Sequence, residues 1–139
     1  MHAESREDHE IGGEIERIRQ IYCSDVLTHP NREVKLLGRK CEAWVLHTLL
    51  GFEVKLGRKR ITCPDIVSAR YLKIFGEIGM KSIRIPHDPS RTAILVAGLE
   101  YALGHIKELL LAQPLDERER KVAVRRTYSR LRERLELNE

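Results

Sequence analysis

The sequence has few of the residues on which a zinc site, a disulfide framework or a nucleotide site depends. Its three cysteines, Cys23, Cys41 and Cys63, form no Cys-x-x-Cys pair, which argues against structural zinc and against disulfides. Its six histidines never form the i, i+4 pair of a helical zinc site, and no glycine-rich phosphate loop is present. We therefore predict buried free thiols, no metal and no cofactor.

Long apolar runs and a secretory signal are also missing. The longest apolar stretches, 94–99 and 109–112, fall well short of the roughly 20 residues that a membrane span requires. The first ten residues are acidic and lack the basic start and apolar run of a signal peptide. We expect no membrane partner and a cytoplasmic location.

Amide side chains are scarce, with two Asn and two Gln among 139 residues, whereas 33% of the residues are charged. This balance is typical of proteins from hot environments, so we predict a thermophilic source. The hydrophobic content of 42% is that of a folded protein, and the length suits one domain. We expect a single helical domain over 13–139 after a disordered acidic N-terminus, 1–12.

Hydrophobic periodicity predicts helices in the first half of the chain. Apolar residues recur at helical spacing over 13–27, and they form two opposite stripes over 31–50. A helix with two apolar stripes is either central to the core or shared with a partner. Thr62-Cys-Pro-Asp65 has the hydroxyl, proline and carboxylate of a helix start, and this third helix ends at Gly79. The stripe expected for the first helix consists of Ile11, Ile15, Ile18, Tyr22 and Val26.

Two more helices are expected in the second half. Asp88-Pro89 starts a fourth helix that extends to about Gln113 and forms the centre of the packing. A charged last helix, 115–137, has only a narrow apolar stripe, so we expect it to dock loosely or to bind a partner.

Short segments of alternating polarity predict strands. Residues 52–56 and 58–62 form a hairpin that turns at Gly57, and 81–86 forms a further strand that could pair with it. The predicted fold class is therefore mainly α: about five helices packed around a central fourth helix, with a small β-hairpin and one further short strand.

Positive charge gathers in two stretches. Residues 32–60 hold eight bases and three acids, and residues 120–134 hold seven bases and one acid. Long basic side chains on a hairpin tip are placed to neutralise phosphates. We predict a nucleic-acid-binding surface formed by Lys55, Arg58, Lys59, Arg60, Arg125, Arg126 and Arg130. Surface ion pairs of a thermophilic protein explain the same composition, and this alternative stays open.

The expected binding is non-enzymatic and favours duplexes. Aromatic residues make up only 5% of the chain, and Trp44 falls on the apolar side of the predicted helix 31–50, so stacking on single strands is disfavoured. No nucleophile is paired with a base, and we assign no catalytic residue. The main alternative is a homo-oligomeric assembly protein, or a small subunit of a complex, with helix 31–50 or 115–137 as its interface.

A metal-dependent nuclease is the third hypothesis. Glu53-Val-Lys55 and Pro64-Asp65 are the pieces of a restriction-type site, in which carboxylates gather Mg²⁺ beside the scissile phosphate. Their order along the chain is the reverse of the usual one, and the position of Asp65 at a helix start suits a capping carboxylate.

Gly57-Arg-Lys-Arg-Ile-Thr-Cys-Pro-Asp-Ile66 resembles the loop and third helix of archaeal histones. The resemblance covers about half of the chain. It implies a structural pair between Arg58 and Asp65, a histone-like helix pair within 13–79 followed by C-terminal helices, and DNA binding by a dimer.

Overall fold

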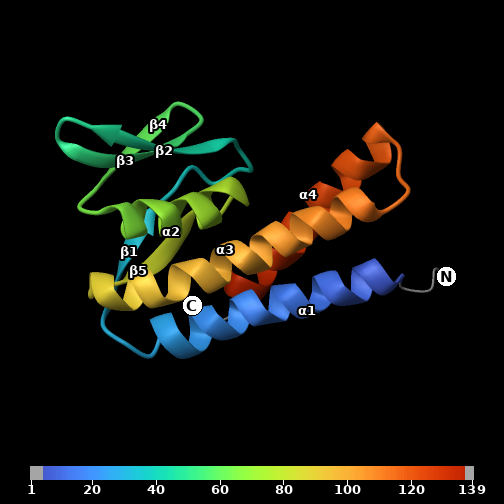
Figure 1. Cartoon of the computed structure of the whole chain (residues 1–139), viewed down its shortest axis with the longest axis horizontal. Helices are drawn as coiled ribbons and strands as arrows, with labels where there is room; N and C mark the ends of the chain where they lie inside the picture. The colour runs from blue at the N-terminus through green and yellow to red at the C-terminus, as the bar shows by residue number, and fades with distance from the viewer. Residues whose placement is uncertain (1–4, 137–139) are drawn as a thin grey trace.

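A computed structural model, which describes residues 5–136, shows a mixed α/β fold (Figure 1). The prediction of a mainly α fold is therefore wrong: the described residues form four α-helices and five strands in two antiparallel sheets. The elements are α1 (Arg6–Ile21), the π-helical turn η1 (Tyr22–Val26), β1 (Asn31–Lys35), β2 (Ala43–Thr48), β3 (Gly51–Leu56), β4 (Lys59–Cys63), α2 (Ile66–Glu77), β5 (Ser82–Pro86), α3 (Pro89–Ala112) and α4 (Glu117–Glu136).

The first helix confirms the predicted stripe but begins earlier than expected. Ser5 caps α1 in a capping box with Asp8, so the helix starts at Arg6. Residues 6–12, predicted to be disordered, are therefore helical, and residues 1–4 of that predicted segment lie outside the described residues. All five residues of the predicted stripe are buried: Ile11, Ile15, Ile18, Tyr22 and Val26.

The predicted helix over 31–50 does not exist. Val34 and Leu36 are buried, whereas Glu33 and Lys35 are exposed, which is the period of two of a strand. Gly38 then adopts φ +87° and Gly51 φ +128°, conformations that end a helix and that other residues rarely adopt. The predicted two-striped helix is thus β1, a loop and β2.

The two sheets pair strands from different parts of the chain. The predicted hairpin is confirmed as β3 and β4, and β2 pairs with the other edge of β3 to complete a three-stranded meander. The predicted strand 81–86 is confirmed as β5, but it pairs with β1 and not with the hairpin. The histone-like helix pair is therefore excluded, because 31–63 is largely strand.

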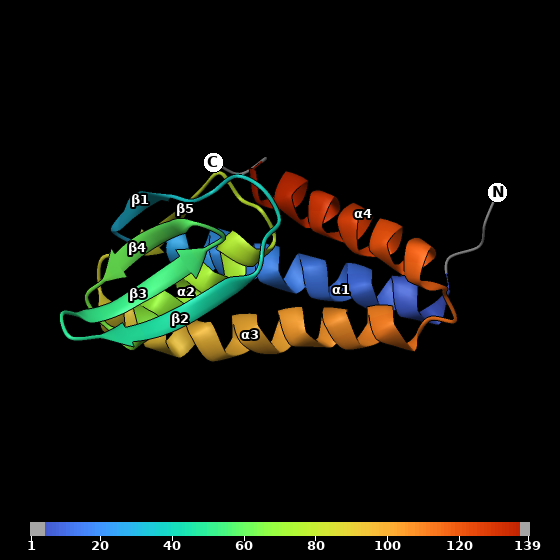
Figure 2. The same cartoon turned by 90° about the horizontal axis from the view of Figure 1, so that it is seen from above.

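The core lies between the helices and the inner faces of the sheets. Helix α2 packs under the meander and against α3 (Figures 1 and 2). Two buried tyrosines fix β5 to its neighbours: the Tyr22 hydroxyl accepts a hydrogen bond from the Arg84 amide, and the Tyr71 hydroxyl donates to the Arg84 carbonyl. These hydrogen bonds attach β5, and with it the β1–β5 sheet, to η1 and α2.

Two helix starts differ slightly from their predictions. The N-cap of α2 is Asp65, whose carboxylate accepts a hydrogen bond from the Ser68 amide at 2.7 Å, and not Thr62. Asp65 is thus a capping residue, as its position in the sequence suggested. The N-cap of α3 is Asp88, as expected.

The last helix is docked, not loose. Tyr128, Leu131 and Leu135 of α4 are at most 4% exposed. None of the helices within residues 5–136 is long and apolar enough to cross a membrane.

Candidate nucleic-acid interface

The outer face of the meander carries an exposed aromatic side chain in line with two cations. Strand register places Trp44 of β2 opposite Lys55 of β3, and Lys55 opposite Arg60 of β4. Side chains in one such row project from the same face of a sheet, about 5 Å from their neighbours. We call Trp44, Lys55 and Arg60 the platform.

The platform is accessible because α2 covers only the opposite face of the sheet. Ala43, Val54 and Leu56 are buried on that inner face, whereas Trp44 is 54% exposed. Arg60 is also exposed, and its guanidinium lies 3.6 Å from the Glu53 carboxylate in the next row. Such a surface ion pair is weak, so Arg60 keeps most of its capacity to bind an anion.

A basic end adjoins the platform at the β3–β4 turn. Lys59 lies at the edge of the inner face, and its ammonium donates to the carbonyls of Lys35 and Leu36. This contact holds the end of β1 and the loop after it against the turn. Exposed cations from both segments are thereby brought together, and we call them the basic end: Lys35, Arg39, Lys40 and Arg58.

Glycines allow the close approach of these segments. A Cβ on Gly79, which has φ +94°, would lie 2.6 Å from the Lys40 amide nitrogen and 2.8 Å from the Arg39 carbonyl carbon. Arg132 of α4 also reaches this junction and donates to the Ile78 carbonyl at 2.6 Å. The basic end is therefore supported by backbone packing from the α2–β5 turn.

The opposite end of the sheet is apolar. Leu49 and Leu50 form the β2–β3 turn and are almost fully exposed, at 105% and 94% of their reference areas. The meander thus presents one charged end, one apolar end and an aromatic side chain between them.

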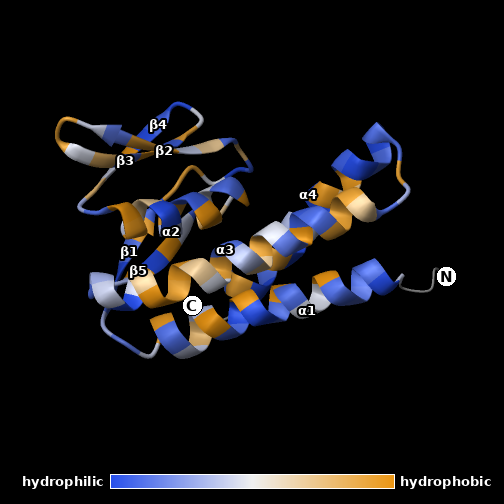
Figure 3. Cartoon of the chain, in the orientation of Figure 1, coloured by the Kyte–Doolittle hydropathy of each residue, from blue (hydrophilic) through white to orange (hydrophobic). Residues whose placement is uncertain are grey.

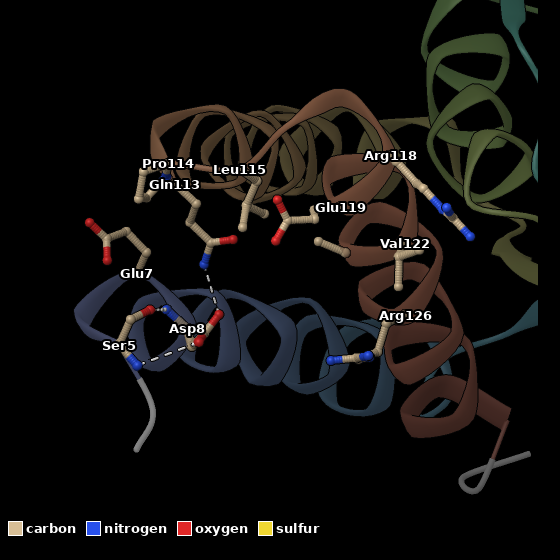
Figure 4. Close-up of a pocket in the computed structure, with 11 residues that line it drawn as sticks. Ser5, Glu7, Asp8, Gln113, Pro114, Leu115, Arg118, Glu119, Val122 and Arg126 are labelled. Carbon is tan, nitrogen blue, oxygen red and sulfur yellow. Dashed lines mark hydrogen bonds between the residues drawn. The ribbon is translucent and has the colours of Figure 1, made fainter. Parts of the chain in front are cut away.

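The predicted arginines of α4 do not join this surface. Arg130 lies over α1, with its guanidinium 3.2 Å from the place of a Cβ on Gly12. Arg126 lines a groove of about 540 Å³ between the start of α1 and the α3–α4 connection (Figure 4). Arg125 is exposed on α4. The structure therefore gathers Lys55, Arg58, Lys59 and Arg60 and separates the three arginines from them.

Other arginines of α4 have intramolecular partners. Arg134 donates to the Glu16 carboxylate of α1 at 2.7 Å, and this hydrogen bond lowers the pKa of Glu16. Arg120 donates to the Gln113 carbonyl at the end of α3. Much of the second basic stretch thus serves to attach α4 to the acidic face of α1 and to α3.

The groove beside Arg126 has a mixed lining. Gln113 bridges its mouth by donating to the Asp8 carboxylate at 2.8 Å, and Leu115 and Val122 supply apolar surface (Figure 4). Three carboxylates, Glu7, Asp8 and Glu119, and two arginines, Arg118 and Arg126, line the groove, so it carries charges of both signs and does not select a ligand of one charge.

The carboxylates of the nuclease hypothesis have other partners. Glu53 pairs with Arg60, and Asp65 caps α2. Within residues 5–136 no three His, Cys, Asp or Glu side chains are arranged to hold a metal ion. The three cysteines are free thiols, but the predicted burial holds for Cys63 and not for Cys23 and Cys41, which are half-buried. Burial raises the pKa of Cys63 to about 11.

Sequence reasoning missed Trp44. The assumption of a helix over 31–50 placed it on an apolar face, whereas β2 projects it to solvent. The available signal was the adjacency of Trp44-Val45, residues that favour strands, to a glycine-bounded hairpin.

Comparisons of the chain with protein families, with curated proteins and with solved structures give no match.

Proposed function

We propose that the chain binds single-stranded nucleic acid through the platform and the basic end. The observation that carries the proposal is the row in which exposed Trp44 lies beside Lys55 and Arg60 on adjacent strands. Proteins that bind single strands combine aromatic side chains, on which bases stack, with cations that follow the phosphates. The platform supplies both within one row of a rigid sheet.

Single strands suit this surface better than a duplex does, in contrast to the expectation from the sequence. A base must be unpaired and turned outward to stack on Trp44, and the exposed ring stands on a sheet rather than on a projecting helix that would enter a major groove. The basic end then lies in the path of the phosphates that follow the stacked base.

Trp44 is the chain's only tryptophan, so fluorescence excited at a wavelength that tyrosine does not absorb reports on the platform alone. We expect oligonucleotides of about 12 residues, oligo-dT and oligo-rU, to quench this fluorescence as the base stacks on the indole. The quenching should weaken steeply with salt, because released counterions contribute to binding. A duplex of the same length is the comparison ligand.

Substitution of Trp44 distinguishes the contribution of base stacking to binding affinity from that of charge. Trp44→Ala should weaken binding of a labelled oligonucleotide roughly 5- to 150-fold, the equivalent of one lost stacking contact. Trp44→Phe should retain most of the affinity. Val122→Ala, which truncates an exposed apolar side chain on α4, is the control. Absence of binding at low salt, or binding without any change in Trp44 fluorescence, would overturn the proposal.

A further inference from the structure

The outward face of α3 carries a largely apolar stripe that is independent of the platform. Ile94, Tyr101 and Leu111 are 78%, 63% and 66% exposed, and Ala97 between them is exposed as well. Most other apolar residues of α3 are buried, so the helix is apolar on two sides. Figure 3 shows more hydrophobic colour along α3 than along α1 or α4.

The stripe has the spacing of a helix-pairing surface. Its members alternate at intervals of four and three residues, the 3.5-residue repeat that keeps one seam facing a partner helix. Six of its positions are exposed and Gly104 is half-buried. The stripe consists of Ser90, Ile94, Ala97, Tyr101, Gly104, Glu108 and Leu111.

Charged side chains border the stripe on both sides. On the α2 side, Arg70 pairs with Glu100, and Lys107 lies 2.8 Å from Glu77. On the α1 side, Arg17 stacks over the Tyr101 ring at 5.8 Å. An apolar strip with a polar rim is typical of a protein interface. Figure 2 shows α3 along one edge of the row of long helices, with α1 and α4 on its far side.

The stripe is complementary to itself when two copies run antiparallel. In the register that places Ile94 opposite Gly104 of a second copy, Tyr101 falls opposite Ala97. Ile94 and Tyr101 then each meet a small residue, whereas Leu111 lies beyond the 90–108 overlap. A Cβ built on Gly104 meets nothing within 4 Å in its own chain. Symmetry repeats each of these contacts twice across the interface.

The same register also gives a favourable position to Glu108, the only charged residue of the stripe. Glu108 falls opposite Ser90 and beside Arg91 in the first turn of the second α3, where the positive end of the helix dipole and the Arg91 cation both favour a carboxylate. The alternative register, shifted by one heptad, would place Glu108 opposite Ala97 in the middle of the interface, where an unpaired charge is costly.

We propose that two copies of this chain associate through the α3 stripe as an antiparallel α3–α3 dimer. The occupant of the stripe is a second copy because large residues meet small ones and Glu108 meets Arg91 only under this two-fold arrangement. The interface that the sequence suggested at 31–50 or 115–137 is replaced by one on α3.

Light scattering after size exclusion, from about 1 to 100 µM protein, tests the dimer. Ala97→Glu would bury a carboxylate against Tyr101 of the second copy, so the dimer dissociation constant should rise by about 100-fold or more. Ala112→Glu is the matched control, because Ala112 is exposed on the same helix but lies beyond the 90–108 overlap. A monomer at every concentration, or equal effects of the two variants, would overturn the proposal.

Charge reversal tests the register. Glu108→Arg should weaken the dimer by about tenfold, because two arginines then face each other, and Arg91→Glu with Glu108→Arg should restore it. The two positions are 17 residues apart on one helix, about 26 Å, so rescue reports a contact between chains. Circular dichroism confirms that each variant is folded. A dimer that is insensitive to Glu108→Arg, or that the second change weakens further, would contradict the antiparallel register.

Discussion

The basic residues of the meander and those of α4 are similarly dense in the sequence, but they have different surroundings in the structure. Lys55 and Arg60 project from the face of the meander opposite α2, and within residues 5–136 only Glu53 lies within ion-pair distance of Arg60. Arg134 and Arg132, by contrast, bind a carboxylate of α1 and a backbone carbonyl after α2. Charge density alone therefore does not distinguish a ligand surface from the attachment of a helix.

The largest expected effect concerns the backbone that supports the basic end. Gly79→Ala should lower the free energy of unfolding by about 3 kcal/mol, because it combines a strained positive φ with a clash against the Lys40 and Arg39 backbone. Gly13→Ala in α1 is the control: a Cβ there meets nothing within 4 Å, so this change should stabilise by about 0.5–1 kcal/mol. Urea denaturation measures both, and destabilisation by both would contradict the described packing.

Charge reversal compares the two basic regions directly. Lys55→Glu with Arg60→Glu should weaken oligonucleotide binding on the order of 100-fold and reduce the salt dependence by about two phosphate contacts. Arg125→Glu with Arg126→Glu introduces the same change in net charge on α4, where we expect less than about a threefold loss. Anisotropy titrations at several salt concentrations measure the affinity of each double variant and its salt dependence. Equal losses would mean that binding follows net charge and not the platform.

A smaller effect, on the pH dependence of stability, is expected from Tyr128, where α4 packs beside the loop that carries the basic end. Burial, together with the charge of Glu77, raises the pKa of Tyr128 to about 12. Because the unfolded chain deprotonates nearer its ordinary value of 10.0, this contribution to stability is complete below about pH 10 and is lost as pH rises toward 12. At pH 11 the loss is about 1.4 kcal/mol.

Tyr128→Phe removes the titrating group and keeps the ring. The variant should therefore lose less stability than the unmodified chain between pH 8 and pH 11, as measured by urea midpoints at the two pH values. Identical losses in both proteins would show that Tyr128 is not shielded at the α4 contact.

Local signals in the sequence identified several elements correctly. The buried face of α1, the β3–β4 hairpin with its turn at Gly57, strand β5 and the Asp88 cap of α3 all follow from residues close together in the chain. Such signals depend on spacing and capping chemistry, which do not require knowledge of distant neighbours.

Residues 31–50 were misassigned because their apolar positions fit both a period of two and a helical period. Strand pairing resolved the ambiguity: β1 pairs with β5, some fifty residues later, and β2 pairs with β3. The β1–β5 contacts are of such long range that they leave no trace in local spacing. Because of this error, Trp44, the most informative side chain of the candidate site, was not recognised as exposed.

The sequence by itself determined the helices with a strong single stripe, the hairpin, the free cysteines and the two basic stretches, because each depends on neighbouring residues or on composition. Only the tertiary structure decided which cations are available to a ligand. The Lys59 ammonium holds the loop that carries Lys40 against the β3–β4 turn, and α1 supplies the carboxylate that Arg134 binds. A cation's role depends on what lies within a few ångströms of it, and folding sets those distances.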